Sequence, residues 1–225
     1  MAVVITLKDS GTSLSNGFDT ASLSMAANTR AIIAVVTALD SPVSFSGHSA
    51  SGGGVSWAEI QTQGYSGRRI VSLFRSDGVP SGIVTITANF SGGTYQESKY
   101  GVFEVAGLDL IDPDDAPVSA ENDGSSSFLN SPDVGTIDAG DMAFMCCGFE
   151  GGADSLAVAS GTTELLLSAG GSNVRSLICG HSTTDDTPGV TWSGTGNGAG
   201  IIGINFNVGG GAPANPTLKM MMSYH

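Results

Sequence analysis

The chain has 225 residues, of which 40% are apolar, 13% are charged and 33 are glycine, and its formal net charge is −13. The apolar share is too high for a disordered protein, and the acidic balance does not provide the basic surface that nucleic acid requires. Because no apolar run approaches about 18 residues, we expect no membrane-spanning segment either.

Along almost the whole chain, apolar and polar residues alternate in short runs, and turn residues separate these runs. This period of two predicts β-strands, and no segment shows a helical period over ten or more residues. The run at 30–38 is almost continuously apolar, as expected at the centre of a sandwich. In chain order, the predicted strands are residues 3–7, 21–25, 30–38, 42–45, 55–61, 69–75, 83–88, 100–105, 118–120, 142–149, 156–159, 163–167, 174–179, 190–192 and 201–208.

The two halves of the chain share one pattern. In each, a long apolar strand leads to a Ser-Leu pair (72–73 and 176–177), then to a Val-Thr pair (84–85 and 190–191) and a closing strand. We predict an all-β fold, an antiparallel β-sandwich that is jelly-roll-like, with two similar four-stranded halves as a possible plan. Two independent small sandwiches are the alternative. We favour one domain over residues 1–208, because four strands do not cover their own face.

The last part of the chain, residues 209–225, differs in composition. A Gly/Pro-rich linker, GGGAPANP, precedes the tail TLKMMMSYH. We expect the tail to act as an arm that docks on a neighbouring subunit, since an apolar tip is costly to leave in water; a disordered end is the alternative. The arm's candidate contact residues are Met220, Met221, Met222 and Tyr224.

The opening residues, MAVVITLKDSG, have no basic region followed by a long apolar core. A secretory signal has both, so we expect synthesis in a cytoplasm without a signal peptide. The three cysteines are Cys146, Cys147 and Cys179, and neither their odd number nor their spacing favours a disulfide framework or a metal site. We expect reduced thiols, with the two neighbours on opposite faces of one strand.

Charge is unevenly distributed. Residues 100–174 contain 13 acidic side chains and no Lys or Arg, whereas 8 acidic and 8 basic residues balance elsewhere. The acidic third either keeps the surface soluble or forms a face for a basic partner. Asp109, Asp112, Asp114 and Asp115 do not have the spacing of a calcium loop, so we expect a turn there and no metal.

No motif for catalysis or for cofactor binding stands out. The stretch GHSAS at 47–51 lacks the second glycine of a nucleophile elbow, and we expect a Gly/Ser loop. Trp57 and Tyr65 offer aromatic rings for stacking on sugars, although a place in the core is more common for such residues. Arg68 and Arg69 offer guanidinium groups for a partner's carboxylates, although an exposed strand start explains them equally well.

The layout of residues 31–109 carries a resemblance. A strand with Trp57 is followed by a G-x-VT strand that begins at Gly82 and by a strand ending in EV-x-G-x-D, from Glu104 to Asp109. In these features the chain resembles a group of β-sandwich proteins that tailed bacteriophages encode among their virion genes. The resemblance is at fold level and is shared with carbohydrate-binding modules. It implies a non-enzymatic virion role and brings no catalytic residues.

We therefore expect a capsid decoration or cement protein, located in the virion. It would bind neighbouring capsid subunits, or tail proteins, and form a symmetric homo-oligomer without a cofactor. The alternative is a tail or fibre module that binds a receptor or glycan through Trp57 or Tyr65. A glycan-degrading enzyme ranks third, because it needs two carboxylates across a groove and no such pair is evident.

Overall fold

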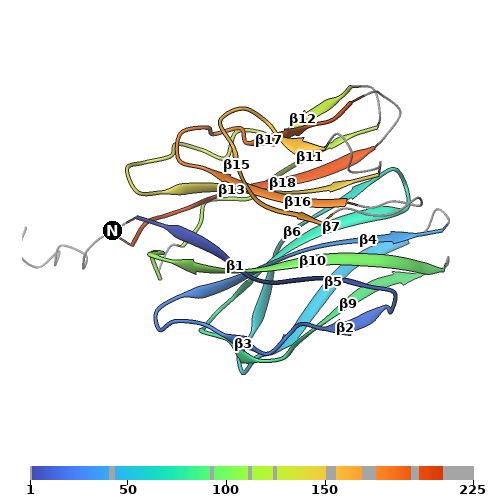
Figure 1. Ribbon diagram of the computed structural model, residues 1–225, viewed down its shortest axis with the longest axis horizontal. Helices are drawn as coiled ribbons and strands as arrows, with labels where there is room; N and C mark the ends of the chain where they lie inside the picture. Colours follow the sequence, from blue (N-terminus) through green and yellow to red (C-terminus); the bar gives the residue numbers. More distant parts are fainter. Residues whose placement is uncertain are drawn as a thin grey trace, which may run out of the picture.

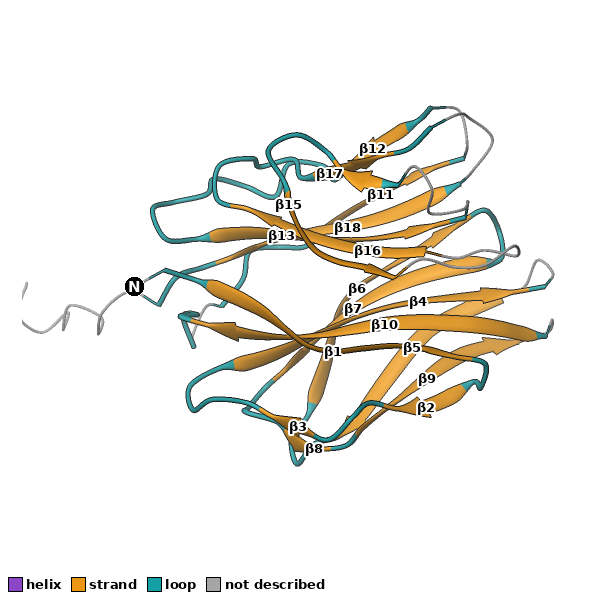
Figure 2. Ribbon diagram, viewed as in Figure 1, coloured by secondary structure: helices purple, strands orange, loops and turns teal. Residues whose placement is uncertain are grey.

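The computed structural model describes residues 2–40, 44–91, 94–110, 113–123, 126–150, 156–168, 176–193 and 198–209. Figure 2 shows strands and loops and no helix over these residues, and every strand pair is antiparallel. The predicted all-β antiparallel fold is confirmed. With no helix in the described ranges, none is present that has the length and apolar character to cross a membrane.

Within the described residues, the first half of the chain forms three sheets. A five-stranded sheet has the order β1-β10-β4-β7-β6, a three-stranded sheet the order β2-β9-β5, and β3 pairs with β8. The bounds are β1 Val4–Ser13, β2 Gly17–Asp19, β3 Leu23–Ser24, β4 Arg30–Leu39, β5 Ser44–Gly52, β6 Trp57–Tyr65, β7 Arg69–Ser76, β8 Ser81–Gly82, β9 Val84–Ser91 and β10 Tyr95–Ala106.

The described part of the second half forms two sheets. A five-stranded sheet has the order β11-β18-β13-β16-β15, and a three-stranded sheet has the order β12-β17-β14. The bounds are β11 Val118–Asn122, β12 Phe128–Asn130, β13 Met142–Phe149, β14 Ala157–Val158, β15 Thr163–Ser168, β16 Ser176–Ser182, β17 Gly189–Thr191 and β18 Ala199–Phe206.

The two halves have the same strand order. If β3 and β8 are left out and the strands of each half are counted in chain order, strands of equal rank correspond. Each strand of the first half then has the same position in its sheet as the strand of equal rank in the second half. Each half thus contributes a five-stranded and a three-stranded sheet, rather than the four strands that we expected from the repeat. In each half the first strand pairs with the last, as in a jelly roll, and the finer jelly-roll assignment stays a prediction.

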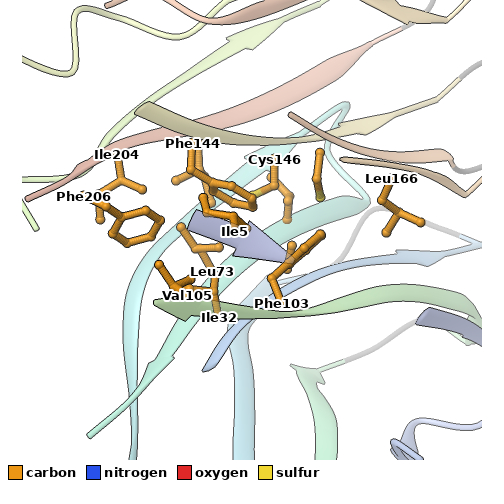
Figure 3. Packing of buried hydrophobic residues seen from close by; sticks show 14 of the residues in the cluster. Ile5, Ile32, Leu73, Phe103, Val105, Phe144, Cys146, Leu166, Ile204 and Phe206 are labelled. Carbon is orange, nitrogen blue, oxygen red and sulfur yellow. The ribbon is translucent and has the colours of Figure 1, made fainter. Parts of the chain in front are cut away.

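The sheets stack in four layers, and the two five-stranded sheets lie in the middle (Figure 1). Apolar side chains fill each space between layers. The central core lies between the two five-stranded sheets and includes Ile32, Leu73, Phe103, Phe144 and Phe206, which point toward one another in Figure 3. A second core lies under β2-β9-β5 and a third under β12-β17-β14.

This layering explains why two strands read as continuous apolar runs. On β4, Ile32 faces the central core and Ile33 the outer one; on β13, Cys146 faces the central core and Cys147 the outer one. The predicted opposite orientation of the two cysteines is confirmed. Because both faces of these strands are covered, neither face needs polar residues.

The contacts between the halves are reciprocal. Edge strand β6 of the first half lies against β11 and β18, and its counterpart β15 lies against β1 and β10. Likewise β7 lies against β13 and β18, and its counterpart β16 against β4 and β10. Such reciprocity is the property of an isologous, two-fold interface, here formed inside one chain.

Glycines at equivalent places allow the halves to approach. A Cβ atom on Gly101 of β10 would lie 2.6 Å from Leu166 Cδ2, and one on Gly200 of β18 would lie 2.6 Å from Tyr65 Cδ1. Each glycine therefore leaves the space that a large side chain of the opposite half occupies. In protein cores, side chains fill space so closely that an added methyl at such a point must displace its neighbour.

Several strands differ from the sequence prediction. The GHSAS stretch lies in β5, not in a loop, and pairs with β9 after a register shift between Phe45 and Gly47. The short strands β2 and β12 were not predicted, because three residues are too few for a recognisable alternation. The predicted strand at 21–25 shrinks to Leu23–Ser24, of which only Leu23 is buried.

We expect Gly200→Ala to destabilise the protein by about 1–3 kcal/mol, because the new methyl overpacks the ring of Tyr65. Gly17→Ala on exposed β2 is the matched control: its Cβ would meet the nearest atom, Thr87 Oγ1, at 3.5 Å, an ordinary contact. Urea unfolding of both variants measures the difference. Equal stabilities of the two variants would contradict the close packing between the halves.

Candidate functional site

Arg68 and Arg69, predicted to bind a partner, lie at the junction of the two halves. Arg69 is only 6% exposed, and its Nη1 is 2.8 Å from Glu150 Oε1 at the end of β13. Arg68 is more exposed, 4.0 Å from the same oxygen, and also donates to the carbonyl of Asp40 at 3.3 Å. Both guanidinium groups thus form ion pairs with Glu150 within the chain, and Arg69 is not accessible to another protein.

Trp57 and Tyr65, predicted as sugar-stacking rings under the alternative, both lie on β6, and they differ in burial. Tyr65 is 1% exposed in the central core, where its ring packs on Gly148 and Gly200. Trp57 is half-buried, packs against the first half's outer core, and donates from Nε1 to the carbonyl of Gly52 at 3.1 Å. Tyr65 therefore cannot stack on a ligand in this fold.

The predicted C-terminal arm lies outside the described residues, and so do Met220, Met221, Met222 and Tyr224. The described chain ends at Gly209, whose N–H donates to the carbonyl of Gly107 at 2.7 Å. This places the start of the arm beside the end of β10, close to Ala2 at the other end of the chain.

A buried polar network surrounds His48. The ring of His48 on β5 reaches Thr37 on β4 through Nε2, at 2.8 Å, and Ser72 on β7 through Nδ1, at 2.7 Å. Ser72 also contacts Thr62, and Thr37 also contacts Ser98. The network joins the three-stranded to the five-stranded sheet and supplies hydrogen bonds to groups that would otherwise be buried alone.

The serine–histidine contact is not arranged for catalysis. Ser72 is 0% exposed and His48 is 5% exposed, so no substrate reaches the hydroxyl. Burial also lowers the pKa of His48 to about 3, which makes the ring a poor general base at neutral pH. The pair therefore stabilises the fold.

The cysteines are free and fully buried. Cys146 and Cys179 lie opposite each other on β13 and β16 and face the central core. Burial raises the pKa of all three thiols, so they remain protonated and unreactive.

Two carboxylates of the predicted acidic turn form bonds within the chain, and Asp112 lies outside the described residues. Asp114 pairs with Arg75 across the two halves, and Asp115 accepts from Asn205 Nδ2 at 3.0 Å and from Asn207 Nδ2 at 3.3 Å. Within the described part of the chain, no three His, Cys, Asp or Glu side chains are grouped to hold a metal ion.

A hollow between β11 and β12 brings an exposed aromatic ring together with polar groups at the surface. It has a volume of 510 Å³ and is lined by Glu121, Asn122, Asp123, Ser126, Phe128, Leu129 and Asn130. Phe128 is 55% exposed at its edge. Sequence reasoning missed this site because Phe128 follows a Gly-Ser run that reads as a loop.

The comparisons with known proteins found no relative of this chain. No family model, no curated protein and no solved structure matches the chain.

We predict that His48 makes the protein less stable in acid. Its folded pKa of about 3 lies below the 6.5 of an exposed ring, so the unfolded chain binds the extra proton between these values. The free energy of unfolding should therefore fall by about 1.4 kcal/mol per pH unit from this group as the pH drops through that window.

Urea unfolding of wild type and His48→Gln between about pH 4 and pH 7 checks this slope. The His48→Gln variant should lose most of this slope of unfolding free energy against pH. His181→Gln is the control: burial lowers the pKa of this ring as well, but the ring is partly exposed, so the slope should change less. Identical slopes for wild type and His48→Gln would contradict the prediction.

Proposed function

We propose that this chain is a non-enzymatic structural protein of a bacteriophage particle, a capsid decoration or cement protein that binds neighbouring virion proteins. The virion assignment rests on the resemblance of residues 31–109 described above. The arrangement of the described residues supports a binding role, because the described Ser–His contact and all three cysteines are buried.

The observation that carries a binding role is the edge strand β1, which exposes apolar side chains on both of its faces. This strand ends the five-stranded sheet of the first half, so one of its backbone edges has no strand partner in that sheet. Val4 is 53% and Leu7 36% exposed on it, and Leu14, just after it, is 79% exposed. Long edge strands that expose apolar side chains are association sites, since another chain can pair with the edge and cover those side chains.

The partner, in this proposal, is a major capsid or tail protein, and the protein acts as a homo-oligomer. The linker and arm at residues 209–225 add a second contact, through Met220, Met221, Met222 and Tyr224. Arm and edge start close together, because Gly209 is bonded to Gly107 and Gly107 lies against Ala2, just before β1. Two linked contacts bind more tightly than either alone, provided that both can engage at once.

The alternative proposal is a receptor- or glycan-binding module of a tail or fibre. Since Tyr65 is buried and Trp57 half-buried, its support comes from the hollow beside Phe128 instead.

A charge on the β1 surface should reduce incorporation into particles. We expect Val4→Lys to lower the occupancy on purified particles about tenfold, because a lysine there opposes burial against a neighbour. Ile83→Lys is the matched control, since Ile83 is also 53% exposed but lies between β8 and β9. Cryo-electron microscopy of the particles gives occupancy and position on head or tail. Absence of the wild-type protein from particles would refute the virion proposal.

Removal of residues 210–225 should weaken incorporation while leaving the fold intact, because Gly209 and its hydrogen bond to Gly107 are retained. Occupancy of the truncated protein on particles, at matched expression, measures the contribution of the arm. A thermal unfolding curve equal to that of the full chain is the control. Unchanged occupancy would show that the arm makes no contact with the particle.

A further inference from the structure

Phe128 is an exposed aromatic ring in a protein that places its large apolar side chains mostly inside. It lies at the start of β12, on the outer sheet of the second half, and pairs in register with Thr191 of β17. Its exposed fraction is 55%, whereas the next strand residue, Leu129, is 8% exposed and belongs to the core. Exposure of a large ring costs free energy, which a binding partner can recover.

The fold itself does not require a phenylalanine at this position. In the first half, the counterpart of Thr191 is Thr85, since each follows a fully buried valine at the centre of a three-stranded sheet. The residue paired with Thr85 is Asp19, which accepts a hydrogen bond from its hydroxyl at 2.6 Å. The first half thus has the polar pair Asp19 and Thr85 at this position, whereas the second half has an exposed aromatic ring.

The groups beside Phe128 supply both hydrogen-bond donors and acceptors. Glu121 and Asp123 are exposed carboxylates, which accept, and Asn130 is an exposed amide, which both accepts and donates. A second hollow, lined by residues such as Val55 and Asp77, and a third, lined by residues such as Asp138, contain no aromatic side chain. The hollow of 510 Å³ is therefore the one, of these three, that combines a flat apolar ring with hydroxyl-binding groups.

Internal hydrogen bonds hold the described residues on two sides of this hollow together. Asn122 is 6% exposed, and its Nδ2 donates to the carbonyl of Phe128 at 3.0 Å and to that of Ser126 at 3.3 Å. The amide thereby ties the end of β11 to the start of β12. A preformed site loses less conformational entropy on binding than a flexible one.

We propose that an uncharged sugar residue binds in this hollow, with one face on the Phe128 ring and its hydroxyls bonded to Glu121, Asp123 and Asn130. An apolar C–H face and a rim of hydroxyls are the complement of a ring flanked by carboxylates and an amide. Anionic sugars are excluded, because the two carboxylates repel them and residues 100–174 contain no Lys or Arg to pair with them.

This inference is independent of the virion assignment. A sugar-binding surface can occur on a decoration protein or on a tail module, and binding is measured on the purified chain. A failure to incorporate into particles would not contradict sugar binding, and an absence of sugar binding would not contradict the proposed contacts of β1.

Affinity electrophoresis of the full chain in native gels that contain dextran, mannan or galactan tests the proposal. We expect at least one of these neutral polysaccharides to retard the protein, and Phe128→Ala to weaken the binding about tenfold or more. Phe128→Trp should retain binding, because it keeps a ring in the same place. Asp19→Ala, at the equivalent position of the first half, should bind as wild type does. Equal melting temperatures for all variants show that the fold is intact.

Three results would overturn the inference. The first is that none of the three polysaccharides retards the wild type. The second is that Phe128→Ala binds as wild type does. The third is that an oligo-arginine peptide, and no neutral polysaccharide, binds in a manner that depends on Phe128; this would assign the hollow to a basic protein segment by cation–π contact.

Discussion

The burial of two five-stranded sheets against each other is the constraint on which the rest of the structure depends. Each half covers the outer face of its large sheet with its own three-stranded sheet, and leaves the inner face bare. Only the other half covers that face, through a core that contains Phe103, Phe144 and Phe206. The hydrophobic effect therefore holds the halves together as it holds two subunits of a dimer, but without the entropy cost of association.

Polar residues at the rim of this core follow from the same constraint. Arg69 pairs with Glu150, Arg75 with Asp114, and Gln61 with Ser119, and each pair joins one half to the other. An apolar centre with a polar rim is the usual anatomy of a protein interface. The acidic residues of the second half are thus partly neutralised by arginines of the first.

The surfaces that remain for binding are those that the packing between the halves leaves exposed. The edge strand β1 keeps exposed aliphatic side chains, and the outer sheet of the second half keeps an exposed ring at Phe128. The exposed side chains of Val4, Leu7 and Phe128 do not belong to the cores, so the chain can vary them without loss of core packing. The difference between Asp19 and Phe128 at equivalent positions is an instance of such variation.

The sequence by itself determined the strand content, the two-fold repeat and the orientation of Cys146 and Cys147, because alternation and apolar runs are local properties. It did not determine where Tyr65, Arg68 and Arg69 lie. Their polar or amphipathic side chains fit a surface as well as an interface, and only the approach of the second half buries or pairs them. Sequence reasoning missed Phe128 for a different reason. Its neighbours in sequence have the composition of a loop, and its ring is presented only because β12 pairs with β17, whose Thr191 is more than sixty positions away.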